Sequence, residues 1–354
     1  MRRRFPRWAP LLACAWLVGA GGCAVQRAPL PPLSETPALA GRDAPVELAG
    51  TPFYPQEALN CGPAALATLL GAAGRAARPE ALAEEVYTPG LGGSLQLELV
   101  AAARARGFLP YRVAPDADAL AAELLAGRPV LVLQNLRLRS WPAWHYAVLV
   151  GADPAADAVV LRSGAERRLS MPAGRFMRTW DRAGRWGLVL LEPGELPARP
   201  MRAHYFDAVA GLEETGRHDA AAAAWQAALQ HWPDDSVALF GLATAHHLAG
   251  RAEAARAGYR RLLALDPLHA AALNNLANLW AEQGCVEAAR ALARRAVAAA
   301  EPGTPIAAAA ADTLRGLPTG VADAADDAGL AAEGSDAGVG VCPDAAAPPD
   351  SYNR

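Results

Sequence analysis

A cysteine in the first half of the chain has the surroundings of a nucleophile. Cys61 stands in the segment LNCGPAALATLL, in which Asn60 suits a helix N-cap, Pro63 suits the first helical turn, and an apolar run follows. We therefore expect Cys61 at the N-terminus of a buried helix, where unpaired backbone N–H groups and the helix dipole stabilise a thiolate. The alternative is a small buried apolar residue, which is what most isolated cysteines are.

A histidine that could serve as the base follows 84 residues later. A cysteine nucleophile needs a base that forms an ion pair with it and later protonates the leaving amine, and imidazole suits both steps. His145, in the segment WPAWHYAVLVGAD, is the single histidine between residues 46 and 200. It precedes a buried strand expected over residues 146–151. The alternative is a structural histidine at a strand start.

The elements that must position these two residues are a helix and a small sheet. Further short strands are expected over residues 129–134, 158–162 and 186–191, each bounded by Gly, Pro or Asp, and a turn near residues 153–157 joins two strands as a hairpin. A cysteine-bearing helix packed on an antiparallel sheet that carries histidine is the papain-like arrangement. We therefore predict an α+β, papain-like domain over residues 46–200.

The motif residues resemble a known family. The segments QEALNCGPAALATLL and HYAVLVGAD resemble the bacteriocin-processing, double-glycine cysteine peptidases and their CGPA relatives. RPVLVL and VVLRSGAERRLSMPAGRFMRTW are similar to a bacterial lipoprotein branch with C-terminal tetratricopeptide repeats, so the resemblance covers about residues 51–302. It implies that Cys61 is the nucleophile, His145 the general acid/base and Gln56 the side-chain donor to the oxyanion. Gln56 lies five positions before Cys61, where better-known members have six.

The third residue of the catalytic group departs from the family pattern. The family carries an Asp followed by Pro at the end of the next strand, whereas this chain has Leu-Arg-Ser-Gly at residues 161–164. Ser163 could accept the imidazole N–H, but a neutral hydroxyl stabilises an imidazolium less than a carboxylate does. Asp153 lies eight residues from His145, roughly 26 Å along a straight strand, and is expected to be a turn residue. We therefore expect slower or more context-dependent catalysis, with Ser163 as the candidate partner.

A 34-residue period follows the predicted peptidase domain. Small residues, an aromatic and Pro recur at fixed positions, which is typical of tetratricopeptide repeats. We predict three repeats over residues 201–302, with a left-handed glycine cap after each first helix and alanine where paired helices approach. Residues 303–354 are rich in Ala, Asp and Gly and are expected to be mostly disordered and acidic, with a capping helix over residues 305–314. The recurring residues are Gly216, Gly250 and Gly284, Ala221, Ala255 and Ala289, Trp225 and Tyr259, and Pro233 and Pro267.

The N-terminus resembles an export signal. Four arginines lie within residues 2–7, and the apolar stretch over residues 8–19 is too short to span a bilayer. Ala20-Gly21-Gly22 before Cys23 resembles a bacterial lipoprotein signal, in which the acylated cysteine becomes the mature N-terminus. Ala20 stands where such signals usually have Leu, so cleavage to an exported, unlipidated protein is the alternative. Ala24, not Asp, after the cysteine favours the outer membrane, facing the periplasm. We predict a signal over residues 1–23 and a tether over residues 24–45.

Composition and cysteine spacing exclude several other classes. Charged residues make up 19% of the 354 residues and the net charge is −3, which gives no basic face for nucleic acid. No CxxC pair or Cys/His cluster has metal-ligand spacing, so we expect no metal, no cofactor and no disulfide scaffold. Cys285 and Cys342 are accordingly expected to be unpaired. Ser94 is expected to cap a helix, and Arg162 to be a solvated surface residue.

Two hypotheses of function follow. The preferred one is an exported, lipid-anchored cysteine peptidase that cleaves a protein or peptide substrate and reaches the membrane through Cys23. Its repeats would bind the substrate or a protein partner. The alternative is a catalytically weak or inactive peptidase-like scaffold lipoprotein that binds partner proteins. Acyl transfer to an amine would use the same Cys61 and His145, and the sequence does not separate it from hydrolysis.

Overall fold

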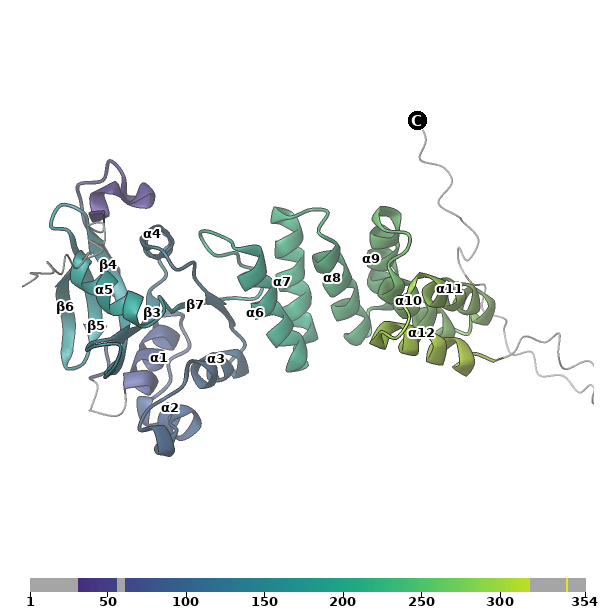
Figure 1. Ribbon diagram of the computed structural model, residues 1–354, viewed down its shortest axis with the longest axis horizontal. Coiled ribbons are helices and arrows are strands. Elements are labelled where there is room, and N and C mark those ends of the chain that lie inside the picture. The colour runs from purple at the N-terminus through teal and green to yellow at the C-terminus, as the bar shows by residue number, and fades with distance from the viewer. Residues whose placement is uncertain (1–30, 56–60, 319–341, 343–354) are drawn as a thin grey trace, which may run out of the picture. The chain divides into compact units, whose positions relative to one another are not determined.

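The computed structural model describes residues 31–55, 61–318 and 342, in two kinds of architecture (Figure 1). Up to residue 191 the chain mixes strands and helices, and from residue 202 onward the described elements are helices. Gln56 and Cys23, two of the predicted functional residues, lie outside the described residues. None of the helices in the described ranges is long and apolar enough to cross a bilayer.

One antiparallel sheet forms the centre of the first part. The strands follow the order β2-β7-β3-β4-β5-β6, and β1 pairs with the far end of β4. The predicted hairpin turn is confirmed, because the Asp153 carboxylate accepts hydrogen bonds from the N–H groups of Ala155 and Ala156 between β4 and β5. The strands are β1 (Val46–Glu47), β2 (Leu109–Arg112), β3 (Val130–Asn135), β4 (Trp144–Asp153), β5 (Ala158–Ser163), β6 (Glu166–Pro172) and β7 (Gly187–Leu191).

Helices cover both faces of this sheet, and alternation along β4 assigns each side chain to a face. Tyr146 and Val148 belong to the apolar cluster that contains the helix beginning at Cys61, whereas Ala147 and Leu149 belong to the cluster on the other side. On the Tyr146 side lie α1 (Cys61–Ala72), α2 (Pro79–Val86) and α3 (Gln96–Ala105), and on the Ala147 side lie α4 (Ala117–Leu125) and α5 (Ala173–Arg182).

Part of the expected tether is folded onto the domain. The two 3-10 helices η1 (Leu33–Glu35) and η2 (Pro37–Leu39) each bury a leucine in the core that contains α4. The Leu33 N–H donates to the Asp157 carboxylate at 2.9 Å, which fixes this segment to the turn after β4. The tether prediction is therefore wrong for these residues, since two isolated leucines in a Pro-rich stretch gave no periodic signal.

The predicted helical repeats are present. Gly216, Gly250 and Gly284 have positive φ angles of 70°, 74° and 77°, so the predicted left-handed caps are confirmed. The recurring alanines at 221, 255 and 289 are fully buried, as expected where paired helices approach closely. The helices are α6 (Arg202–Glu214), α7 (His218–His231), α8 (Ser236–Leu248), α9 (Ala252–Leu265), α10 (Ala270–Glu282) and α11 (Val286–Ala299).

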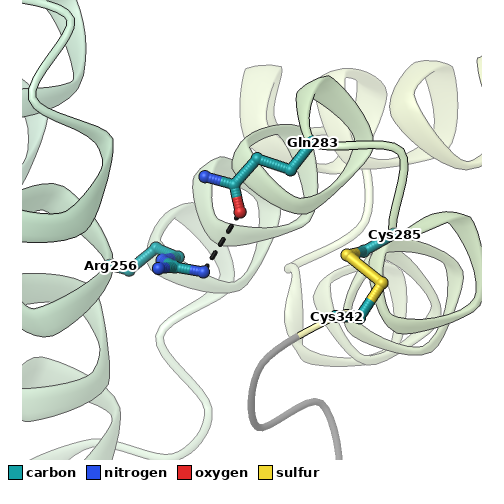
Figure 2. Close-up of a disulfide and its surroundings, with 4 residues drawn as sticks. All are labelled: Arg256, Gln283, Cys285 and Cys342. Carbon is teal, nitrogen blue, oxygen red and sulfur yellow. Dashed lines mark hydrogen bonds between the residues drawn. A yellow bond between two sulfur atoms is a disulfide. The ribbon is translucent and has the colours of Figure 1, made fainter. Parts of the chain in front are cut away.

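The end of the repeat region holds a further helix and a disulfide. The expected capping helix is α12 (Pro305–Gly316), whose N-cap Thr304 accepts a hydrogen bond from the Ala307 N–H. Cys285 is disulfide-bonded to Cys342, as Figure 2 shows, so the prediction that both are unpaired is wrong. Cys285 is buried just after an exposed turn, and 57 residues separate it from its partner, a spacing that matches no motif.

Candidate active site

Cys61 is the first residue of α1, where the sequence placed it. It is the one free cysteine among the described residues and is partly exposed. The helix buries the residues after it, from Gly62 to Leu70, so the backbone that carries the thiol is held by packing on the sheet. The thiol therefore lies at the N-terminus of a helix whose position is fixed by packing.

A cavity of about 540 Å³ opens beside Cys61. Because Cys61 lines this cavity, which is large enough for a substrate, the alternative of a buried, inert cysteine is disfavoured. The walls come from the loop before α3, from β3 and β4, and from the residue after α5. The lining residues are Cys61, Leu91, Gly92, Gly93, Ser94, Leu95, Gln96, Leu133, Trp144, Tyr146 and Ala183.

Tyr146 and Cys61 both line the cavity. Burial, and then the negative charge of the Cys61 thiolate, raise the pKa of Tyr146, so the phenol stays protonated. Its hydroxyl donates to the Ser94 carbonyl oxygen at 3.2 Å, and its ring meets Trp186 edge-on at 6.0 Å between centroids. These contacts fix β4 against the loop before α3 at the position of the thiol.

His145 is held by Ser163. The imidazole Nε2 lies 2.8 Å from the Ser163 hydroxyl oxygen, and Ser163 is only 8% exposed. Ser163 therefore contacts the imidazole, and its catalytic role stays a prediction. Burial lowers the pKa of His145. The other ring nitrogen, Nδ1, makes no hydrogen bond to any residue within the described ranges.

The structure brings His145 to the edge of the cavity without placing its ring in the lining. Its two neighbours along β4, Trp144 and Tyr146, both line the cavity. His145 pairs across the strands with Gln134, whose amide donates to Thr179 on α5, so the imidazole leaves β4 on the face opposite to Tyr146. Within the part of the chain that the structure describes, no hydrogen bond joins the Cys61 thiol to the imidazole.

Two residues near the site differ from the sequence predictions. The residue at the N-cap position of α3 is Leu95, not Ser94, and the Ser94 hydroxyl is buried without a hydrogen-bond partner in the described ranges. Arg162 is 2% exposed, not solvated: its guanidinium donates to the carbonyl oxygens of Ala49 and Thr51. It also donates to the Arg167 carbonyl oxygen at 2.6 Å. An arginine in a β-rich segment gives no sign of burial, because two of the three carbonyl groups that bind it are distant in sequence.

Comparison with protein families agrees with this architecture. Residues 49–187 match the Peptidase_C39 like family, and residues 211–267 and 249–304 match the tetratricopeptide repeat. The chain joins a Peptidase_C39-like domain to tetratricopeptide repeats. The resemblance stated from the motifs and the predicted fold class, a papain-like α+β domain followed by helical repeats, are both confirmed.

Solved structures resemble either part of the chain. A C39-like peptidase from Bacillus anthracis is 18% identical, with 42% of this chain and 98% of that one covered and a TM-score of 0.36. The peptidase domain of Streptococcus ComA, a bi-functional ABC transporter involved in a quorum sensing pathway, is 20% identical over 40% and 98% of the two chains, with a TM-score of 0.33. The Sgt2 tetratricopeptide domain from Aspergillus fumigatus is 17% identical over 42% and 98%, with a TM-score of 0.32. No curated protein matches the chain at a significant level.

Proposed function

We propose that the chain is an exported, lipid-anchored cysteine peptidase that hydrolyses a peptide bond in a protein or peptide substrate. One observation carries the proposal: a free cysteine at the start of a buried helix opens on a cavity that is lined by both neighbours of a Ser-held histidine. The match of residues 49–187 to the Peptidase_C39 like family supports the same chemistry.

The reaction uses the two nitrogen atoms of His145 for different tasks. Ser163 holds Nε2, so Nδ1 is the ring nitrogen that would take the proton from Cys61; because the imidazole leaves β4 on the face opposite to Tyr146, this step requires the ring to reach the thiol around the end of the strand. The thiolate attacks the carbonyl carbon, a C–S bond forms, and the backbone N–H of Cys61 with the Gln56 amide stabilises the oxyanion. The imidazolium then protonates the amine as the C–N bond breaks. A water molecule gives a proton back to the imidazole and hydrolyses the thioester, which releases the acid and regenerates the thiol.

We infer the cellular location from the export signal predicted over residues 1–23. Acylation of Cys23 would attach the mature chain to the outer membrane, facing the periplasm, and the repeats would bind the substrate or a protein partner. The Cys285–Cys342 disulfide supports export, because disulfides persist in oxidising compartments and are rare in the cytosol. The repeats fit this role, since such stacks present extended surfaces to other proteins.

A thiol probe and matched variants test the proposal. The full chain should hydrolyse peptides, and both Cys61→Ala and the nearly isosteric Cys61→Ser should lose at least about 1,000-fold of this activity. Iodoacetamide should alkylate Cys61 about tenfold faster in the folded chain than in the chain unfolded by urea at the same pH. The proposal fails if Cys61→Ala cleaves peptides like the parent, or if folding does not accelerate alkylation.

The neutral partner of His145 favours one competing function. A hydroxyl at Ser163 stabilises the imidazolium less than a carboxylate, which is what a weak or inactive peptidase-like scaffold would show. Such a scaffold lipoprotein would bind partner proteins through its repeats. If the chain is such a scaffold, Cys61→Ala should keep its function in the host, whereas deletion of residues 202–316 should abolish it. If the chain is a peptidase, Cys61→Ala should abolish the function.

A further inference from the structure

The walls of the cavity beside Cys61 are apolar. Leu133 and Tyr146 form its buried side, and Leu91, Leu95 and Trp144 form its exposed rim. The three rim side chains are 64%, 43% and 57% exposed, which is unusual for such large apolar groups. Apart from the Cys61 thiolate, none of the described lining residues carries a charge, so a charged side chain bound against the leucine and tryptophan walls would lose its water without gaining a partner there.

The cavity is also larger than a small side chain needs. A volume of about 540 Å³ lies within the range of sites that bury whole ligands. Glycine has no side chain with which to fill it, so a peptide with glycine next to the scissile bond would leave the leucine and tryptophan surfaces in contact with water. A bulky apolar side chain would cover them.

One polar atom faces this apolar surrounding. The Ser94 hydroxyl oxygen is buried and makes no hydrogen bond to the described residues, although Ser94 lines the cavity. It lies against the second residue of α1, because a Cβ built on Gly62 would come within 2.7 Å of it. This buried hydroxyl next to the residue that carries the nucleophile therefore lacks a partner, which a polar group of a bound ligand could supply if the loop before α3 shifted to admit it.

We propose that this cavity binds a bulky apolar side chain, such as Leu or Phe, of an extended peptide next to the scissile bond, with the Ser94 hydroxyl bonded to the peptide backbone. The inference rests on the proposed peptidase function and names its substrate class. The selectivity follows from the walls: leucine or phenylalanine is favoured, and glycine or lysine is disfavoured. The effect expected from burying one such side chain is roughly tenfold to 200-fold.

Binding to the inactive full chain tests the substrate class without requiring turnover. Fluorescently labelled peptides that differ only by Leu, Phe, Gly or Lys at one position are titrated into Cys61→Ala and followed by anisotropy. Leu and Phe peptides should bind at least about tenfold more tightly than Gly and Lys peptides. Adding Leu91→Asp should remove this preference and improve binding of the Lys peptide, whereas Ser94→Ala should weaken all peptides by a similar factor.

A matched control keeps the test specific. Leu97 is 70% exposed but does not line the cavity, so Leu97→Asp adds the same charge nearby and should leave the preference unchanged. Equal binding of all four peptides, or an equal effect of Leu91→Asp and Leu97→Asp, overturns the inference. If the active enzyme cleaves peptides with glycine next to the scissile bond best, the inferred side-chain preference is wrong, but the proposed peptidase function still holds. Selective binding by a chain that never cleaves supports the cavity and refutes the peptidase.

Discussion

Replacing Ser163 by Asp tests whether His145 acts on Cys61 as an ion-pair partner. The hydroxyl lies 2.8 Å from Nε2 and the residue is buried, so a carboxylate introduced there faces the imidazole directly. Ser163→Asn is the matched control, because the amide has nearly the same shape and no charge. Any change produced by Asp alone is therefore a change in electrostatics.

The size of the effect follows from the geometry. Two unit charges about 4 Å apart attract by about 4 kcal/mol at an effective dielectric of about 20. Burying the new carboxylate offsets part of this energy, and neighbouring opposite charges raise a pKa by about 1 to 3 pH units. We expect the pKa of His145 to rise by about 1 to 2 pH units, against the lowering that burial now causes. Each pH unit corresponds to about 1.4 kcal/mol and a tenfold change in the ratio of protonated to neutral imidazole.

The rate at which iodoacetamide alkylates Cys61, measured from pH 5 to 9, reports this change. In Ser163→Asp the rate at pH 7 should rise about tenfold, and it should stay high to a more alkaline pH than in the parent. Ser163→Asn should show no such rise. If Asn and Asp accelerate alkylation equally, charge is not the cause. If neither variant alters the pH profile, the imidazole held by Ser163 is not paired with the thiol, and the proposed mechanism is wrong.

Three further predictions concern stability, each measured as the free energy of unfolding in urea. Gly241→Ala should lower the free energy of unfolding by about 1–3 kcal/mol, because the new Cβ would lie 2.5 Å from the Trp225 indole nitrogen. Gly174→Ala is the control: its Cβ would meet only the flexible end of an arginine side chain, so stability should be unchanged or slightly higher. Equal effects at both sites would contradict this prediction. Cys342→Ser should lower stability by up to about 4 kcal/mol, since the disulfide closes a 57-residue separation in the unfolded chain, and a reductant should do the same to the parent and nothing to the variant. Burial lowers the pKa of His145, so the unfolded chain binds a proton more readily than the folded chain, and the free energy of unfolding should decrease as the pH drops below about 6.5. In His145→Gln this decrease should be smaller. If the variant shows the same decrease as the parent, the lowered pKa of His145 is not its cause.

Much of the fold was predictable because its signals are local. The start of α1 at Cys61, the strand that carries His145 and the turn at Asp153 each follow from capping, alternation or turn chemistry within a few residues. The helical repeats were predictable from their 34-residue period, and Gly216 shows the expected positive φ. Ser163 could be named as a candidate because the motif fixes which strand follows the histidine.

What the sequence did not give depends on groups that meet from distant parts of the chain. The Cys285–Cys342 disulfide joins two residues with no shared motif, and Arg162 is buried partly by the backbone oxygens of Ala49 and Thr51, more than 100 residues away. The cavity is of the same kind: Leu91 and Trp144 lie 53 residues apart and meet only when the loop before α3 packs on β4. Composition and periodicity carry no information about contacts between residues that are distant in the sequence.

The end of β5 connects the two halves of the proposed site. Ser163 holds the imidazole, and its neighbour Arg162 binds the carbonyl oxygens of Ala49 and Thr51, in the segment that leads towards Cys61. Alternation sends these two side chains to opposite faces of the sheet, the same two faces from which His145 and the Cys61 helix approach. The same strand end thus contacts both the segment before Cys61 and the imidazole, from opposite faces of the sheet. The contact to the imidazole comes from a hydroxyl and not from a carboxylate, so it can orient the ring but adds little charge stabilisation.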